Sequence, residues 1–377
     1  MSARPVSILS VVGARPNFMK AAPIARALAA HRAGFAHQLV HTGQHYDSAM
    51  SDAFFADLLM APPNYRLEIG SGSHAQQTAA VMLGLEPVLT ETAPDLVIVV
   101  GDVNSTLAAA LTAKKLGLAV AHVEAGLRSH DMSMPEEINR RCVDGISDLL
   151  FTTDPIADAA LRREGVPPER IHFVGNVMID SLNAHLAAAT DLAYWRGLGL
   201  APQRYAVLTL HRPSNVDDAA LLTRLLCAIR DAADLPIIFP IHPRTLAQVE
   251  RHGLLKLFNA EPSRPGIFLT PPLGYLAFLS LIQAARIVIT DSGGVQEETA
   301  VLGAPCVTLR ANTERPITLT DGDNHLAGAG PCEVRRVIGE VLSRPRQTKP
   351  LPEKWDGHAA DRIADIIAAH FAEGAAF

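Results

Sequence analysis

Residues 96–126 read LVIVVGDVNSTLAAALTAKKLGLAVAHVEAG, and this stretch decides the fold. It holds two apolar runs, Leu96–Asp102 and Ala119–Gly126, on either side of the alanine-rich stretch Ser105–Lys115. Short runs rich in β-branched residues are typical of strands buried on both faces of a parallel sheet. Alanine and lysine favour helix in the stretch between them. Strand, helix and strand in this order predict a βαβ unit.

The same alternation fills the rest of the chain in two series, which predicts two domains. The first series has predicted strands at Val6–Gly13, His37–Gly43, Leu96–Asp102, Ala119–Gly126, Leu149–Thr153 and Ile171–Gly175, and helices at Ala21–Ala30, Gln76–Thr92, Ser105–Lys115 and Glu136–Asp148. The second has strands at Tyr205–His211, Ile237–His242, Ile267–Pro271, Ile287–Thr290 and Cys306–Leu309, and helices at Asp217–Ala233, Thr245–Leu255, Tyr275–Ala285 and Gln296–Leu302.

We therefore predict an α/β fold of two Rossmann-like, doubly wound parallel-sheet domains, residues 1–177 and 178–359. The helical segment 360–377 could pack on either domain, and we assign it to the first. Ligands of such sheets bind beyond the carboxyl ends of the strands. We expect the two domains to face a central cleft, with these ends on either side of it.

Composition excludes several classes of protein. With 377 residues, 48% hydrophobic and 19% charged, the chain has enough apolar material for buried cores. A net charge of −6 does not suit a nucleic-acid-binding protein, which usually carries a basic surplus. Four dispersed cysteines predict no disulfide framework. We expect no signal peptide, no membrane span and a cytoplasmic location.

Charged residues gather after the predicted strands of the first domain. Arg15 and Lys20 follow the first strand at a helix N-terminus, where backbone N–H groups favour an anion. Asp102 follows the third strand, and its alternative role is a helix N-cap. Glu124 ends the fourth strand, where a charge is expensive to bury unless it is paired or used; the alternative is an ion pair with Arg128.

The run Met134-Pro135-Glu136-Glu137 continues to Arg140. Proline and acidic residues suit the first turn of a helix, so an ordinary helix start explains these residue types equally well. Only the expected closeness of Asp102 and Glu124 favours a functional role for Glu136.

The second domain offers a phosphate-binding pattern. Ser292, Gly293 and Gly294 follow a strand and open a helix, so that glycine backbone and helix N–H groups can receive a phosphate. Glu298 lies one turn inside that helix, where it can accept two ribose hydroxyls. His211 and His242 each follow a strand and precede Arg-Pro or Pro-Arg, which suggests phosphate and ribose contacts.

We expect neither a metal nor a cofactor. His41 and His45 are four residues apart, but they lie in a strand end and turn rather than on a helix face. The chain has no GxGxxG fingerprint and no GxSxG nucleophile motif.

Taken together, eight motifs resemble the non-hydrolysing UDP-N-acetylglucosamine 2-epimerases. They are GARPNFMK at 13–20, GDVNST at 101–106, HVEAGLRS at 122–129, MPEEINR at 134–140, TLHR at 209–212, IHPR at 241–244, DSGGVQEE at 291–298 and NTERP at 312–316. The resemblance covers nearly the whole chain and implies the GT-B fold. It also implies a homodimer that acts on a UDP-sugar without a cofactor.

The resemblance assigns roles to residues of this sequence. The catalytic group it implies is Asp102, Glu124, Glu136 and His211. The substrate-binding group is Arg15, Lys20, Arg140, His242, Phe278, Ser292, Gly293, Gly294, Glu298 and Arg315. Which carboxylate acts as base and which as acid is left open.

The implied activity is reversible C2 epimerisation of UDP-GlcNAc to UDP-ManNAc through elimination of UDP and a 2-acetamidoglucal intermediate. The alternatives are an epimerase for a modified UDP-HexNAc such as a 2,3-diacetamido uronic acid, a hydrolysing 2-epimerase, a GT-B glycosyltransferase, and a non-catalytic nucleotide-sugar sensor. The sequence departs from the family pattern at Asn17 and Leu273. It also lacks a basic residue after Gln44-His45, which puts activation by a second UDP-GlcNAc in doubt.

Overall fold

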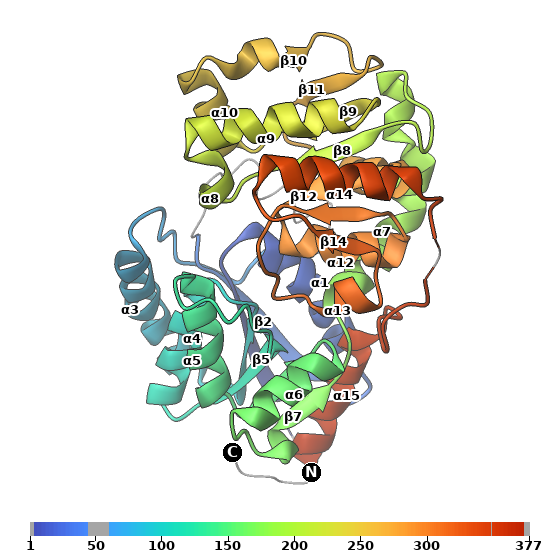
Figure 1. The fold of residues 1–377 in the computed structure, drawn as a ribbon. Coiled ribbons are helices and arrows are strands. Elements are labelled where there is room, and N and C mark those ends of the chain that lie inside the picture. Colours follow the sequence, from blue (N-terminus) through green and yellow to red (C-terminus); the bar gives the residue numbers. More distant parts are fainter. Residues whose placement is uncertain (1–3, 44–59, 348, 373–377) are drawn as a thin grey trace. The chain divides into compact units, whose positions relative to one another are not determined.

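The computed structural model describes residues 4–43, 60–347 and 349–372, without the side chain of Arg15. The chain divides into two compact units, Met1–Ser181 with Glu353–Phe377, and Leu182–Pro352. Each unit is built on a parallel sheet with helices against it (Figure 1). The predicted fold class of two doubly wound α/β halves is therefore confirmed. The domain limits 1–177 and 178–359 stay a prediction, while the compact units divide after Ser181 and again after Pro352.

The first unit carries, within its described residues, a seven-stranded parallel sheet in the order β3-β2-β1-β4-β5-β6-β7. Its strands are β1 (Val6–Val12), β2 (Phe35–His41), β3 (Tyr65–Arg66), β4 (Leu96–Val100), β5 (Ala119–Ala125), β6 (Leu149–Thr152) and β7 (Ile171–Phe173). Its helices are α1 (Arg15–Ala30), α3 (His74–Thr92), α4 (Asn104–Lys115), α5 (Pro135–Ile146), α6 (Pro155–Arg163) and α15 (Ala359–Ala372), while α7 (Val177–Leu192) leads into the second unit.

Both faces of this sheet are covered, as the uninterrupted apolar strands require. In β4, Ile98 packs with residues of α1 and α15, whereas Val97 and Val99 pack with residues of α3, α4 and α5. Helices α3, α4 and α5 lie side by side, and the C-terminal α15 packs against α1 (Figure 1). The last helix of the chain thus completes the core of the first unit.

Helix α1 begins six residues before its predicted start at Ala21, because Asn17 stabilises its first turn. The Asn17 side-chain oxygen accepts hydrogen bonds from the backbone N–H groups of Gly13 and Ala14, at 3.2 and 3.1 Å. Pro23 inside the helix has no N–H to give to the carbonyl of Met19 four residues earlier. The Ser181 hydroxyl donates to that same carbonyl, so the helix continues through the proline.

The second unit repeats the architecture, with seven described parallel strands in the order β10-β11-β9-β8-β12-β13-β14. The strands are β8 (Ala206–Thr209), β9 (Pro236–Pro240), β10 (Phe258–Asn259), β11 (Gly266–Thr270), β12 (Ile287–Thr290), β13 (Cys306–Thr308) and β14 (Asn324–Leu326). The helices are α8 (Pro213–Val216), α9 (Ala219–Ala232), α10 (Pro243–Arg251), α11 (Tyr275–Ala284), α12 (Gly293–Leu302), α13 (Ile317–Thr320) and α14 (Pro331–Ser343).

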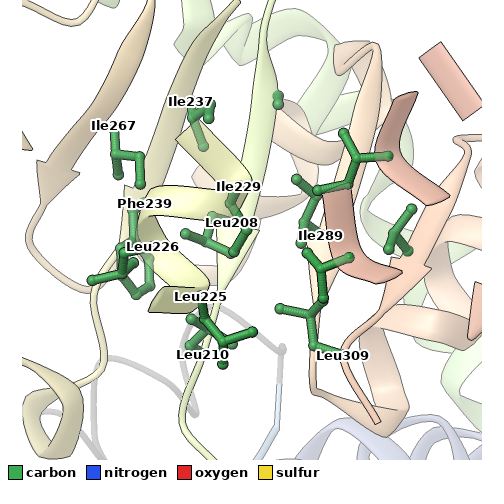
Figure 2. Close-up of a cluster of buried hydrophobic side chains, with 14 of the residues drawn as sticks. Leu208, Leu210, Leu225, Leu226, Ile229, Ile237, Phe239, Ile267, Ile289 and Leu309 are labelled. Carbon is green, nitrogen blue, oxygen red and sulfur yellow. The ribbon is translucent and has the colours of Figure 1, made fainter. Parts of the chain in front are cut away.

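The core of the second unit lies between its sheet and α9, which packs beside α14. Figure 2 shows Leu225, Leu226 and Ile229 of α9 against side chains of the central strands, among them Leu208 and Phe239. These side chains are fully or almost fully buried.

The predicted strands match the observed ones within two residues at each end. Elements that the pattern did not predict include α6, α7, α14, β3, β10 and β14. Helix α10 begins at Pro243 and ends at Arg251, not at Leu255, because the chain turns at Gly253, which has a φ of +63°. No helix in the described part of the chain has the length and apolar content that a membrane span needs.

Replacing Ile363 of α15 by alanine should lower the free energy of unfolding by about 2–5 kcal/mol, because the side chain is fully buried in the core shared with α1. Urea denaturation followed by circular dichroism measures this loss. L83A is the matched control, since the Leu83 side chain is 72% exposed on α3 of the same unit. Equal stability of I363A and L83A would contradict the packing of α15 in this core.

Candidate active site

Polar residues collect at the same relative position in both units, where the strand order reverses. In the first unit the reversal lies between β1 and β4, and in the second between β8 and β12. Loops after neighbouring strands diverge at such a switch point and leave room for a ligand beyond the carboxyl ends of the strands.

Glu124 stands near the end of β5 in an unusual backbone conformation. Its φ is +70°, in the left-handed region that a side chain with a β-carbon rarely adopts. The pairing of β5 with β6 also shifts register between Val123 and Ala125, so Glu124 forms a β-bulge. Bulges and strained residues re-aim side chains and occur often at functional sites.

The Glu124 carboxylate forms a buried ion pair with the Lys20 ammonium of α1. The alternative ion pair with Arg128 is wrong, because Arg128 instead binds Asp144 and Glu164, at 2.7 and 2.6 Å. Gly101 lies beside the Lys20–Glu124 pair with a φ of +69°. A β-carbon there would come within 3.3 Å of the Lys20 nitrogen, and the positive φ would strain any other residue, so glycine is favoured at this position.

Asp102 is held by a cation in the same way. Its Oδ2 lies 2.5 Å from Nη1 of Arg140, whose side chain is buried. The alternative role of Asp102 as a helix N-cap is wrong, since the N-cap residue of α4 is Val103. Asn139 adds a hydrogen bond of 2.8 Å to the Asp102 carbonyl, so α5 fixes this loop at two points.

Glu136 and Glu137 are adjacent at the start of α5, but their environments differ. Glu137 is fully buried and binds Arg140 at 2.7 Å and the Ser129 N–H at 2.9 Å. Burial alone would raise the pKa of Glu137, but the Ser129 N–H and the Arg140 guanidinium outweigh it and lower that pKa to about 2. Glu136 is half-buried one turn before Arg140, and no described residue pairs with its side chain.

In the second unit, His211 is oriented by Asp291. Its Nδ1 lies 2.8 Å from Oδ1 of the fully buried Asp291. Asp291 also accepts from the backbone N–H of Arg212 and the side-chain amide of Asn215, at 2.9 and 3.1 Å. Burial opposes ionisation, but His211 and these donors hold the pKa of Asp291 below its usual range. Asp291 was not among the predicted site residues, although it begins the motif at 291–298.

The predicted phosphate loop opens α12 directly after β12 and Asp291. Ser292 is the N-cap residue, and within the described structure its side chain makes no capping hydrogen bond to the helix. The first N–H groups of a helix lack partners inside the helix and attract anions. Gly293 packs so closely that a β-carbon would lie 2.8 Å from Oε1 of Glu314.

Arg315 belongs to a buried charge cluster next to this loop. Its Nε lies 2.6 Å from Glu297, and Arg310 and Arg212 lie 2.6 and 3.6 Å from Glu314. Burial would raise the pKa of Glu314, but Arg315, Arg310 and Arg212 outweigh it and hold that pKa well below its usual range. Guanidinium groups thus offset the buried Glu297 and Glu314 carboxylates beside the N-terminus of α12.

The remaining predicted residues of the second unit lie around these groups. Glu298 is buried next to Tyr275, and burial together with the Glu298 carboxylate raises the pKa of the Tyr275 hydroxyl above its usual range. Phe278 lies half-buried three residues after Tyr275 on α11. The ring centres of His242 and His211 are 5.9 Å apart.

Two predictions fall on groups that the structure does not describe: the side chain of Arg15, and residues 44–47 of the segment without a basic residue. Among the described residues, no three His, Cys, Asp or Glu side chains lie together as metal ligands would.

The family model described as UDP-N-acetylglucosamine 2-epimerase matches residues 26–368. A Methanococcus maripaludis protein named UDP-N-acetylglucosamine 2-epimerase is 40% identical over 95% of this chain and 97% of its own length. This chain belongs to the UDP-N-acetylglucosamine 2-epimerase family. A relative from Pseudomonas aeruginosa, named UDP-2,3-diacetamido-2,3-dideoxy-D-glucuronate 2-epimerase, is 39% identical over 96% of this chain and 99% of its own.

Solved structures of 2-epimerases share this fold. The UDP-GlcNAc 2-epimerase of Methanocaldococcus jannaschii, crystallised with UDP-GlcNAc and UDP, superposes with a TM-score of 0.88 at 40% identity. The match covers 97% of this chain and all of that one. The GT-B type expected from the family resemblance is therefore confirmed.

The different environments of Glu136 and Glu137 predict different effects of the same substitution. E137Q should lower the free energy of unfolding by roughly 1–3 kcal/mol at pH 7, because it leaves buried donors of Arg140 and Ser129 poorly paired. The Glu137 pKa is lowered on folding, so its stabilisation is present above the unfolded value. The deficit of E137Q should therefore shrink as the pH falls from about 4.5 to about 2.

Urea denaturation at a series of pH values measures both effects. E136Q is the control, since it removes the same charge from the half-buried neighbour. A deficit of E137Q that persists undiminished at pH 2 would contradict the ion pair with Arg140.

Proposed function

We propose that this chain catalyses the reversible C2 epimerisation of UDP-GlcNAc to UDP-ManNAc without a cofactor, and so supplies activated ManNAc-type sugars for cell-surface polysaccharides. Family membership and the names of the relatives support this activity. The substrate in this proposal is a UDP-sugar.

The C2 hydrogen of a UDP-hexosamine has no neighbouring carbonyl on the ring, so direct deprotonation is unfavourable. Elimination avoids this difficulty. A carboxylate takes the C2 proton while the C1–O bond to UDP breaks, and 2-acetamidoglucal remains beside UDP. A carboxyl group then returns a proton to C2 from the opposite face as the UDP oxygen adds to C1. The enzyme must supply proton-transfer groups on two faces and stabilise the departing diphosphate.

In the proposal, Asp102, Glu124 and Glu136 of the first unit share the proton transfers. The observation that carries this assignment is the way in which the three carboxylates are held. Buried cations fix Asp102 and Glu124 at neighbouring strand ends, whereas Glu136 is half-buried and unpaired within the described structure. Glu136 is therefore the carboxylate whose side chain is least constrained by described partners.

The second unit binds the nucleotide in this proposal. The phosphate loop at the start of α12, with its N–H groups and the Arg315 guanidinium near it, suits a diphosphate that carries growing negative charge as it departs. His211, oriented by Asp291, would donate to a diphosphate oxygen. The proposed contacts of the UDP-sugar are Arg15, Lys20, Arg140, His242, Phe278, Ser292, Gly293, Gly294, Glu298 and Arg315.

A second candidate substrate is a modified UDP-HexNAc such as a UDP-2,3-diacetamido uronic acid. The Pseudomonas aeruginosa relative, named for such a sugar, is almost as similar to this chain as the Methanococcus protein. The same elimination at C2 serves both sugars, and the proton-transfer proposal is unchanged. The proposal further includes a homodimer in the cytoplasm, which rests on the family resemblance alone.

We expect E136Q to lose most of its turnover, about 100-fold or more in kcat, while its affinity for UDP stays within about twofold. A coupled assay of epimerisation and isothermal titration with UDP measure the two quantities. E169Q is the matched control, because Glu169 is exposed in the short helix Pro168–Arg170 of the same unit. Wild-type turnover in E136Q would remove Glu136 from the chemistry.

The elimination route also predicts that solvent deuterium enters C2 of both the product and the recovered substrate. Mass spectrometry after incubation in D₂O should show one added mass unit in each sugar, because the C2 proton exchanges through a carboxyl group open to solvent. A product that forms without deuterium would rule out this route.

A further inference from the structure

Three residues on one face of α5 connect this helix with the three proposed catalytic carboxylates. Glu136, Arg140 and Asp144 are spaced by four residues, and this spacing stacks side chains on one side of a helix. Glu136 is itself the first carboxylate, and Arg140 binds the second, Asp102, at 2.5 Å. Asp144 lies one turn further along α5, next to the end of β5 that contains the third carboxylate, Glu124.

Asp144 binds the chain on both sides of Glu124. Its Oδ1 lies 2.6 Å from Nδ1 of His122, two residues before Glu124. Its Oδ2 accepts from the backbone N–H of Gly126, two residues after Glu124, at 3.1 Å. A single buried carboxylate therefore bridges the two ends of the bulge in β5.

The bulge requires such a support. Glu124 has a φ of +70° and is left out of the register between β5 and β6. A residue with a β-carbon stays in this conformation only when its surroundings enforce it. Asp144 is buried and is further fixed by Arg128 at 2.7 Å, so it provides a rigid point of attachment.

His122 extends the support to β4. Its Nε2 donates to the Gly101 carbonyl at 2.8 Å. Gly101 lies beside the Lys20–Glu124 pair and directly precedes Asp102. The hydrogen bonds between Asp144 and His122 and between His122 and Gly101 thus connect Asp144 with the residue that lies between the Glu124 and Asp102 carboxylates.

We propose that Asp144 is a positioning residue, which through His122 and Gly126 keeps the Glu124 carboxylate in the geometry needed for proton transfer at C2. The catalytic part of this inference rests on the proposed function. The structural part, that Asp144 enforces the conformation of residue 124, does not.

Alanine at position 144 removes both points of attachment. The two carboxylate oxygens of Asp144 bind His122 on one side and Gly126 and Arg128 on the other. Asparagine would be a weaker test, because its NH₂ group can donate to Nδ1 of His122 while its oxygen still accepts from Gly126. D144A should therefore release both ends of the bulge.

The matched control is D148A. Asp148 follows α5 in the chain and accepts from the Val120 N–H at 2.8 Å, so it also holds β5, but at the end away from Glu124. Both variants lose a carboxylate that binds this strand, and only D144A affects the bulge. We expect kcat of D144A to fall about 100-fold with KM and UDP affinity nearly unchanged, and kcat of D148A to stay within about threefold of the wild type.

Crystal structures of both variants provide a readout that does not depend on turnover. We expect residue 124 of D144A to leave the left-handed region or to separate from Lys20, with both features retained in D148A. If D144A does not fold, D144E supplies the same comparison, because it keeps the charge but lengthens the side chain. Retention of the Glu124 conformation in the Asp144 variant, or equal kcat in the Asp144 and Asp148 variants, would overturn the inference. A wild-type chain without turnover would instead count against the proposed function.

Discussion

The pairing of buried carboxylates with buried cations is the constraint on which the rest of this structure depends. An ionised carboxylate loses its hydration when a parallel sheet and its helices enclose it, and only a close cation or several donors offset that loss. The buried Glu124 of β5 is therefore paired with Lys20 of α1, and the partly exposed Asp102 after β4 is paired with the buried Arg140 of α5. These two ion pairs connect α1 and α5 to the ends of neighbouring strands.

The second unit meets the same constraint with different residues. The buried Asp291 is balanced by His211 and by N–H donors from the loop after β8, and the buried glutamates near α12 are balanced by arginines. Here the arginines lie beside a helix N-terminus, whereas the first unit places carboxylates at its strand ends. This difference between two halves of the same fold is the basis of the proposed division between diphosphate binding and proton transfer.

The sequence predicts the fold well, because strands buried on both faces are apolar throughout and stand out from the helices between them. The sequence predicts the bounds of an element less well where a single tertiary contact determines them. The early start of α1 depends on Asn17, and its passage through Pro23 depends on Ser181, more than 150 residues away in the chain. The strand β14 has only three residues, too few to show a pattern.

In the candidate site, too, some residues can be predicted from the sequence and others only from tertiary contacts. The sequence singles out Asp102, Glu124 and His211, because charged residues at strand ends are conspicuous in an apolar background, whereas Glu136 rests on the family resemblance. The partners of these residues are less visible: the sequence offers Arg128 as the alternative partner of Glu124, which instead pairs with Lys20, and it does not predict that Asp144 and Asp291 hold the neighbouring groups. These residues differ from ordinary helix and loop residues only in their tertiary contacts, and a single sequence does not reveal those contacts.

The central claim is that this chain inverts C2 of a UDP-sugar. Proton NMR of the purified chain with UDP-GlcNAc tests it most directly. The account predicts that UDP-ManNAc signals grow to a constant ratio, that the same ratio is reached from UDP-ManNAc, and that UDP-2,3-diacetamido uronic acid behaves likewise if it is the preferred sugar. Release of free ManNAc, or unchanged spectra with every one of these sugars, would contradict it.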